Sequence, residues 1–297
     1  MLRARGYLTF AGFMAALLAR QLLMVLTVCG LMMTIGRISA GGLSTLSGEK
    51  AMTVAGLLMM TAVGTSLGAV SLMRQVARTR RLRAWIRATS REPSRRLAEA
   101  AGAAGVDTRV VEVSCESAYA FTFGYVRPYI VVSSGLVERC TVQELQAVLV
   151  HEWAHAAALD PFKVMIARSY ADIFFYLPAV GDILRRYIER RELVADRAAL
   201  QQCGTPAVAG ALFQVSSGHN ARVHTGKGAV AAMSGTELFD ARLTQMETGT
   251  FPRIPLSTPG RMMTSLGVLA LFAVTLASAW ALCLPGACVG LCVMGIC

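Results

Sequence analysis

The stretch His151-Glu152-Trp153-Ala154-His155 decides how the whole chain is interpreted. On a helix, side chains four residues apart leave the same face, so the two imidazoles point in one direction. Two neutral imidazole nitrogens in that arrangement can bind one Zn²⁺ at about 2.0–2.1 Å each. Glu152, directly after the first histidine, is placed to take a proton from a water on that ion. The stretch therefore predicts a zinc-binding helix.

The residues around this stretch favour a helix over residues 142–157. Thr141-Val142-Gln143-Glu144 has the pattern of a capping box, and the apolar positions that follow are spaced as on one helix face. The chain has only four histidines, and two of them lie in the motif. The alternative is a chance pair of surface or core histidines, which explains neither the spacing nor the helix signal.

A hydrolytic zinc site needs a third protein ligand and one open position. The candidate is Glu192, in the stretch Arg191-Glu192-Leu193-Val194-Ala195-Asp196. Asp196 is four residues beyond Glu192 and therefore on the same helix face. It can hydrogen-bond the outer nitrogen of a ligand histidine and fix its tautomer. The alternative for Asp196 is a surface acid paired with Arg191 or Arg197. We expect one Zn²⁺ per chain, held by His151, His155 and Glu192.

These motifs resemble those of a known family. His151-Glu152-x-x-His155, Asp160-Pro161 and Glu192-Leu193-x-Ala195-Asp196 are similar to the M56 membrane metallopeptidases of the BlaR/MecR type. The related M48 peptidases share the zinc pattern. Similarity to M56 continues upstream, in the segments 120–124, 127–130 and 134–136, and covers residues 95–250.

The resemblance implies a gluzincin-like zinc peptidase domain that acts on protein or peptide substrates. It also implies a separate sensor or repressor protein as a partner, because sensor members carry a large ligand-binding domain that we do not expect here. Phe239-Asp240-Ala241-Arg242-Leu243 is similar to a short helix late in the domain. Arg242 is thus a candidate contact for the oxyanion or a substrate carboxylate, with a surface arginine as the alternative.

Composition points to a membrane protein. The chain has 297 residues, of which 55% are hydrophobic, more than an ordinary soluble domain carries. Apolar runs predict transmembrane helices at about residues 17–36, 51–73 and 262–284. The first run also has the look of a signal peptide, but no convincing cleavage site follows it, so we expect an uncleaved anchor. Residues 285–297 form a Cys-rich apolar tail. Its cysteines and the preceding Cys283 match no metal-ligand spacing: Cys283, Cys288, Cys292 and Cys297.

A basic segment follows the second apolar run. Residues 74–96 contain nine arginines and a single acid, Glu92. Next to an apolar segment such a run favours binding to anionic membrane lipid and marks the cytoplasmic side. Nucleic acid is the alternative partner for a basic run, and its position makes that partner the less favoured one. We therefore expect a multi-pass cell-membrane protein whose catalytic domain faces the cytoplasm.

Residues 97–260 have the composition of the catalytic domain. Short strands are predicted at 109–114, 118–123 and 129–133, with a turn at 124–128. A sheet edge beside the zinc helix would hold an extended substrate by strand addition, and a small packed sheet is the alternative. His219 and His224, in a glycine-flanked loop, are candidates to steady the oxyanion. Solvated loop histidines are the alternative.

The sequence thus predicts a membrane α-helical protein with a small α+β gluzincin-like zinc peptidase domain. The function expected is that of a membrane-anchored zinc metalloendopeptidase, with Glu152 as the general base. Two alternatives are a regulatory membrane protein that uses the zinc fold as a scaffold, and an M48-like quality-control protease.

Overall fold

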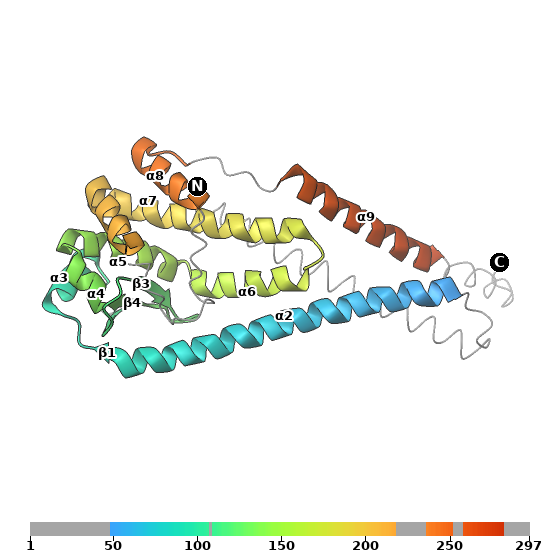
Figure 1. The fold of residues 1–297 in the computed structure, drawn as a ribbon, viewed down its shortest axis with the longest axis horizontal. Helices are drawn as coiled ribbons and strands as arrows, with labels where there is room; N and C mark the ends of the chain where they lie inside the picture. Colours follow the sequence, from blue (N-terminus) through green and yellow to red (C-terminus); the bar gives the residue numbers. More distant parts are fainter. Residues whose placement is uncertain (1–47, 107–108, 218–235, 252–257, 282–297) are drawn as a thin grey trace, which may run out of the picture. The chain divides into compact units, whose positions relative to one another are not determined.

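The computed structural model describes residues 48–106, 109–217, 236–251 and 258–281 (Figure 1). These residues belong to two compact units, which are described separately. The first unit contains the described parts of Ser71–Arg168 and Leu184–Pro255, and the second those of Tyr7–Val70, Ser169–Ile183 and Leu256–Cys297. All the candidate site residues that the structure describes lie in the first unit.

A four-stranded sheet forms the centre of the first unit. Its strands are β1 (Ser90–Arg91), β2 (Val110–Val113), β3 (Ala120–Phe123) and β4 (Tyr129–Ser133). Their order is β1-β2-β4-β3, in which β2 and β4 are parallel and the other two pairs are antiparallel. The three strands predicted from sequence correspond to β2, β3 and β4. The strand β3 stands at one end of this order.

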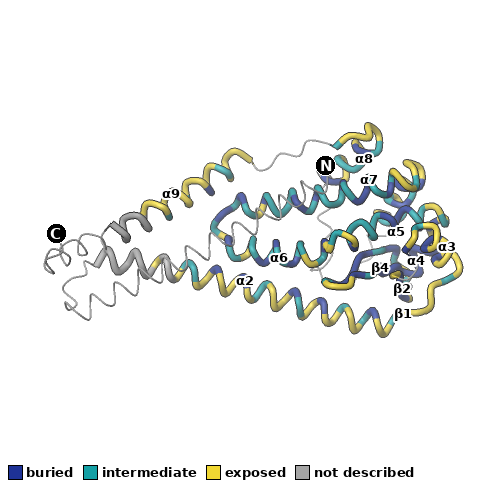
Figure 2. The backbone as a smooth tube through the Cα atoms, turned by 180° about the vertical axis from the view of Figure 1, so that it is seen from behind, coloured by how far each residue is buried: buried dark blue, intermediate teal, exposed yellow. Residues whose placement is uncertain are grey.

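Each face of the sheet packs against helices, because successive side chains of a strand point to opposite faces. Ile130 and Val132 lie in the core with α3 (Arg95–Ala104) and α5 (Val142–Ala157). On the other face, Phe121 and Val131 pack against Ile86 in the last part of α2 (Gly48–Thr89). Figure 2 shows these buried segments in dark blue. The sheet is thus one layer between helices, and α5 is held directly on it.

The start of α5 is fixed by the predicted capping box. Thr141 Oγ1 accepts a hydrogen bond from Glu144 N at 3.2 Å, and Glu144 Oε2 accepts one from Thr141 N at 2.7 Å. Leu145 and Leu149 are fully buried one turn apart. The predicted helix over residues 142–157 is confirmed, and its packing fixes the direction in which its histidines point.

Gly135, in the short helix α4 (Ser134–Arg139), lies close to the backbone of the loop between β2 and β3. A Cβ on Gly135 would lie 1.9 Å from the carbonyl oxygen of Glu116. We expect Gly135→Ala to lower the free energy of unfolding by about 3 kcal/mol, because backbone on both sides must shift. Gly102→Ala on α3 is the matched control, since nothing lies within 4 Å of its Cβ position. Urea titration measures both, and equal stability of the two variants would contradict the close approach.

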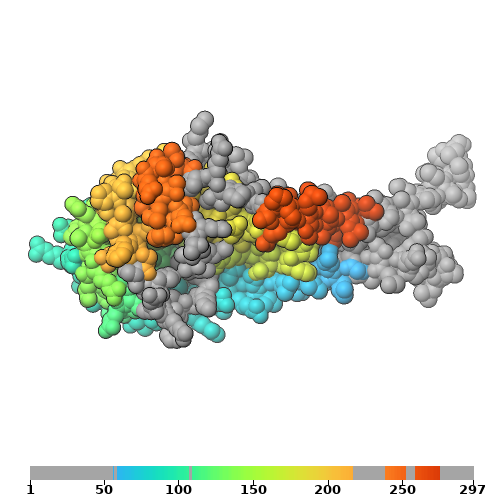
Figure 3. All heavy atoms as spheres, turned by 45° about the horizontal axis from the view of Figure 1, so that its top comes forward, coloured from blue at the N-terminus to red at the C-terminus, as the bar shows by residue number. Residues whose placement is uncertain are grey.

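The first unit also contains the start of α6 (Asp160–Ile173), most of α7 (Pro178–Ser217) and the whole of α8 (Thr236–Thr248). Helix α6 follows α5, and α7 runs back, with a kink at Gly204. Helix α8 lies at the surface against α7 (Figure 3), where Gln245 Nε2 donates to the Leu193 carbonyl at 2.8 Å. Because α7 carries Glu192 and α5 carries the histidines, this packing determines whether the three can meet.

The second unit contains the first part of α2, the α6–α7 junction and α9 (Pro259–Ala281). Gly68 of α2 lies so close to Ile173 that a Cβ would be 2.2 Å from the isoleucine side chain. Ala179 N donates to Ser265 Oγ of α9 at 3.0 Å, and Arg261 pairs with Asp182 at 3.2 Å.

The structure corrects the predicted fold class and location. A membrane-spanning helix needs about 20 mainly apolar residues. Among the described residues no helix has both the length and the apolar character for a span. The run at 51–73 lies in α2, where glycine, serine and threonine dilute the apolar residues, and the helix continues into the arginine segment. The membrane α-helical fold class and the multi-pass cell-membrane location are therefore wrong for this part of the chain. The run at 17–36 and the tail at 285–297 lie outside the described residues.

Candidate metal centre

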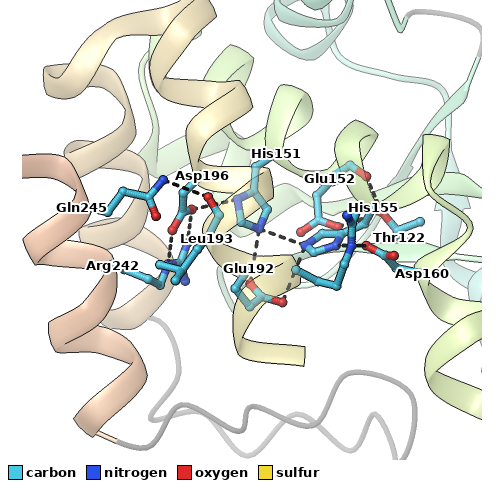
Figure 4. A network of polar contacts seen from close by, with 11 residues as sticks. Thr122, His151, Glu152, His155, Asp160, Glu192, Leu193, Asp196, Arg242 and Gln245 are labelled. Atoms are coloured by element: carbon cyan, nitrogen blue, oxygen red, sulfur yellow. Dashed lines mark hydrogen bonds and ion pairs between the residues drawn. The ribbon is translucent and has the colours of Figure 1, made fainter. Parts of the chain in front are cut away.

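Two helices bring the three predicted ligands together. His151 and His155 come from α5 and Glu192 from α7, and their ligand atoms all lie within 4.8 Å of one another (Figure 4). The two Nε2 atoms are 3.2 Å apart, and they lie 3.5 and 3.6 Å from the carboxylate oxygens of Glu192. Ligands about 2.0–2.1 Å from a tetrahedral Zn²⁺ are separated from each other by about 3.3–3.5 Å. The spacing of these three side chains fits that ion.

Each histidine contacts a carboxylate through its other ring nitrogen. His151 Nδ1 lies 2.9 Å from Asp196 Oδ1, and His155 Nδ1 lies 2.8 Å from Asp160 Oδ2. A carboxylate at Nδ1 accepts a hydrogen bond from Nδ1–H. This fixes the tautomer in which Nε2 carries a lone pair that can bind a metal. The sequence pointed to Asp196 for this contact but missed Asp160, which entered the sequence analysis only as part of the motif Asp160-Pro161.

The position of Asp160 depends on an unusual backbone conformation at Leu159. Leu159 has φ 54°, in the left-handed region, and it is the one described residue other than glycine with a positive φ. A non-glycine residue there costs about 1–2 kcal/mol. The turn ends α5 and starts α6 at once, which returns the Asp160 carboxylate to His155 on the last turn of α5. Such strain is typical of functional sites.

An arginine holds each of these carboxylates. Arg242 of α8 donates from Nε to Asp196 Oδ2 at 2.6 Å and from Nη2 to Oδ1 at 2.7 Å. Arg191 of α7 donates from Nε to Asp160 Oδ2 at 2.7 Å. The sequence analysis offered Arg242 as an oxyanion or substrate contact, whereas the structure places its guanidinium on Asp196. Paired N–H donors of this kind fix a carboxylate in direction as well as position.

Glu152 is held by a residue of the sheet. Thr122 Oγ1 on β3 lies 2.8 Å from Glu152 Oε2 and 2.7 Å from the Glu152 carbonyl oxygen. Figure 4 shows Glu152 next to His155, on the other side of the imidazoles from Asp196. Sequence reasoning missed Thr122, because nothing in a strand pattern says which threonine faces the helix.

Burial and neighbouring charges shift the pKa values of the predicted ligands. Burial lowers the pKa of His151, but its contacts with Asp196 and Glu192 outweigh burial and raise that pKa to about 10. For Glu192, burial raises the pKa, yet the charges of His155 and His151 bring it well below its usual range. Because an imidazole binds a metal in its neutral form, an ion that binds there competes with protons for these nitrogens.

Two predicted residues cannot be placed. His219 and His224 lie outside the described residues, so their proposed contact with the oxyanion stays a prediction.

The alternative for Asp196 was a surface ion pair with Arg191 or Arg197. Arg191 contacts Asp160 instead, and the Arg197 guanidinium lies over the Phe251 ring, 5.0 Å from its centroid.

Comparison with known families agrees with this geometry. The family model for peptidase family M48 matches residues 84–240, just over half of the chain. The chain belongs to peptidase family M48. Within the matched region lie both histidines, Glu152, Glu192 and the two aspartates. The sequence motifs had suggested M56. The family shown is instead M48, the related family that shares the zinc pattern.

One relative of this M48 chain is the plastoglobule-localized metallopeptidase 48, chloroplastic, of Arabidopsis thaliana. The two are 32% identical over 110 residues, which is 34% of this chain and 32% of the relative. The chain therefore spans about a third of the length of that protein. The M48 match makes this chain a metallopeptidase by family, and the site described above holds the residues for a metal.

Proposed function

We propose that this M48 chain is a zinc metalloendopeptidase in which His151, His155 and Glu192 hold the ion. The observation that supports this most directly is the spacing of their three ligand atoms, all within 4.8 Å of one another. The donor set of two imidazoles and one carboxylate, with a fourth position open, is that of catalytic zinc. The Nδ1 contacts of both histidines leave each Nε2 for the ion, and the two Nε2 atoms are 3.2 Å apart.

Glu152 is the proposed general base. A zinc ion at this site supplies Lewis acidity, which makes a bound water more acidic and polarises the scissile carbonyl. Glu152 takes the proton as the water oxygen attacks the carbonyl carbon. It then gives that proton to the amine nitrogen as the C–N bond breaks. Thr122 holds one carboxylate oxygen of Glu152, Oε2, which keeps the other available for the proton.

The free edge of β3 is the proposed substrate-binding strand. Ser133 N donates to the Tyr119 carbonyl at 3.0 Å, so in the β3–β4 register every second pair from there is hydrogen-bonded. By this alternation Ala120 and Thr122 direct their backbone N–H and C=O groups away from β4. An extended peptide can pair with these groups as an added strand. Pairing at Thr122 brings a peptide bond beside Glu152.

Metal removal tests this proposal. We expect a strong chelator to abolish cleavage of an unfolded protein substrate by the full chain, because the three ligands alone cannot activate water. Stoichiometric Zn²⁺ should restore cleavage, whereas Ca²⁺ and Mg²⁺ should not, since they prefer all-oxygen ligands. Fragments are followed by mass spectrometry. Cleavage that continues in the chelated protein would refute the assignment.

Arg242 is proposed to position His151 through Asp196. We expect Arg242→Ala to weaken zinc binding by about 10–100-fold, because the Asp196 carboxylate then loses the two N–H donors of Arg242 that hold it against His151. Competition with a fluorescent chelator measures the affinity. Arg139→Ala, at an exposed position of α4, removes the same charge and serves as the matched control. Equal affinity in the two variants would show that α8 does not support the site.

A further inference from the structure

We propose that one exposed face of α2 docks on an anionic lipid surface, with the helix lying flat on that surface. The face covers residues 73–88, all in the first unit, and is called the arginine face below. Its charged members are Arg74, Arg78, Arg80, Arg81 and Arg87. The contact is peripheral, so it needs no spanning helix, and it does not involve the metal centre.

The five arginines lie on the side of α2 that faces away from the sheet. All five are exposed. Thr79 and Ile86, seven residues apart on the same turns, are only 7% and 3% exposed and mark the buried side of the helix. Figure 2 shows this alternation of exposed and buried turns along α2. The fold therefore fixes which side of α2 is free to meet a partner.

The charges of the arginine face are not compensated within the described part of the chain. Residues 51–91 contain no aspartate or glutamate. Among the described residues none bonds to the guanidinium groups of these five arginines. Two neighbours differ: Arg91 Nε donates to Glu112 at 3.0 Å, and the Arg83 guanidinium lies 5.7 Å from the centroid of the Phe123 ring. Those two arginines serve the fold and are not counted in the face.

The spacing of the arginines adds repulsion within the helix. Arg74 and Arg78 are four residues apart, and Arg78 and Arg81 are three apart. Like charges at these spacings are neighbours on the helix surface and destabilise it. An anionic partner would replace this repulsion by attraction, so charge complementarity identifies the partner as an anion.

The middle of the arginine face is apolar, with a row of arginines on each side. Successive residues of a helix are turned by about 100°, which fixes the rows. One row consists of Arg74, Arg78 and Arg81, and the other of Arg80 and Arg87. Between them lie four exposed residues: Met73, Ala77, Ala84 and Ala88. Met73 is 62% exposed, which leaves a large apolar side chain without cover in the described structure.

This arrangement fits a lipid surface better than other anions. A helix at a lipid interface places its apolar strip against the acyl boundary, while flanking arginines extend sideways to the headgroup phosphates. A polynucleotide or an acidic peptide is bound through charges and hydrogen bonds, and neither would use Met73. Each basic residue close to an anionic lipid surface strengthens binding by about fivefold.

The test is sedimentation of the full chain with vesicles of phosphatidylcholine, made with and without about 30 mol% phosphatidylserine. We expect binding to the phosphatidylserine vesicles to be more than about 100-fold tighter, because five arginines each contribute. Raising NaCl from about 0.05 to 0.5 M should release the protein, since salt screens exposed charges. Equal binding to the two kinds of vesicle would overturn the inference.

Paired variants separate the arginine face from net charge. Arg74→Gln combined with Arg81→Gln should weaken binding to the phosphatidylserine vesicles by about 25-fold. Arg95→Gln combined with Arg139→Gln removes the same charge from exposed positions of α3 and α4, and should change binding by less than about threefold. Equal losses in the two pairs would mean that net charge acts and the face does not. If thermal unfolding shows that a variant is not folded, the vesicle and salt comparisons of the wild type still decide.

Met73→Ala distinguishes lipid from other anions. It should weaken vesicle binding by about fivefold, because a large apolar side chain no longer enters the interface. Double-stranded DNA and polyglutamate serve as competitors. If either binds more tightly than the vesicles and Met73→Ala leaves vesicle binding unchanged, the partner is not lipid and the inference is wrong.

The peptidase proposal is tested separately from this one. Glu152→Gln leaves α2 untouched and should bind the vesicles like the wild type, with or without zinc. Loss of vesicle binding in the arginine-face variants therefore reports on docking alone.

Discussion

Glu152→Gln is expected to lower the rate of peptide-bond cleavage by about 10²–10⁴-fold while the protein keeps its zinc. Glutamine has the same shape as glutamate, and its amide oxygen can still accept from Thr122 Oγ1, which lies 2.8 Å from Glu152 Oε2 in the structure. An amide cannot take a proton from water at neutral pH. The zinc ligands are untouched, so the loss should appear in turnover and not in metal content.

The measurement compares kcat/KM and bound zinc in the two proteins. Glu138→Gln is the matched control, because Glu138 is an exposed acid on α4 outside the site. It should cleave at the wild-type rate. If Glu152→Gln retains most of its activity, Glu152 is not the base. If it also loses zinc, the variant reports on folding of the site and the mechanism gains no support from it.

Glu192→Ala is expected to weaken zinc binding by more than about 100-fold. Removing a residue that only hydrogen-bonds a ligand lowers the metal affinity by about 10–100-fold. Glu192 is a proposed ligand itself, so its loss should lower the affinity further. Glu192 is also the one proposed ligand on α7, since both histidines come from α5. Two imidazoles on one helix face cannot supply a third direction around a tetrahedral ion.

Asp240→Ala is the control for Glu192→Ala, because Asp240 is an exposed carboxylate on α8. Both proteins are titrated with zinc against a chelator of known affinity. The control should bind like the wild type. Similar zinc affinity of Glu192→Ala and the control would mean that the third ligand comes from elsewhere, and the proposed centre would need a different composition.

Local patterns made much of this site predictable. The capping box at Thr141 and the four-residue spacing of the histidines both concern contacts within one helix, and such contacts depend on spacing alone. Glu192 was the candidate because a hydrolytic zinc site needs a third ligand, and Asp196 was placed on the same face as Glu192 by the four-residue spacing. The short strands were visible because β-branched and aromatic residues cluster between turn residues.

The contacts that sequence reasoning missed join segments whose relation is set by tertiary structure. Asp160 reaches His155 only because Leu159 takes a left-handed conformation, which leucine rarely adopts. Thr122 meets Glu152 through the register of an edge strand, 30 residues away in sequence. Arg242 reaches Asp196 from a separate helix, 46 residues further along. None of these follows from periodicity.

The membrane prediction failed for a different reason. It rested on the overall composition and on the length of uncharged apolar runs. Both criteria treat runs diluted by alanine and glycine like runs of leucine. Composition states how much apolar surface a chain has and not which partner covers it. In α2 the small residue Gly68 lies against Ile173, so part of that surface is used in helix packing.

Anomalous diffraction at the zinc absorption edge tests the central claim most directly. Crystals of the zinc-loaded chain, measured on both sides of the edge, should show a single strong peak among His151, His155 and Glu192. The peak should lie about 2.0–2.1 Å from each Nε2 and about 2.0–2.2 Å from a Glu192 oxygen. A peak at other residues, or a Glu192 carboxylate turned away from the ion, would contradict it.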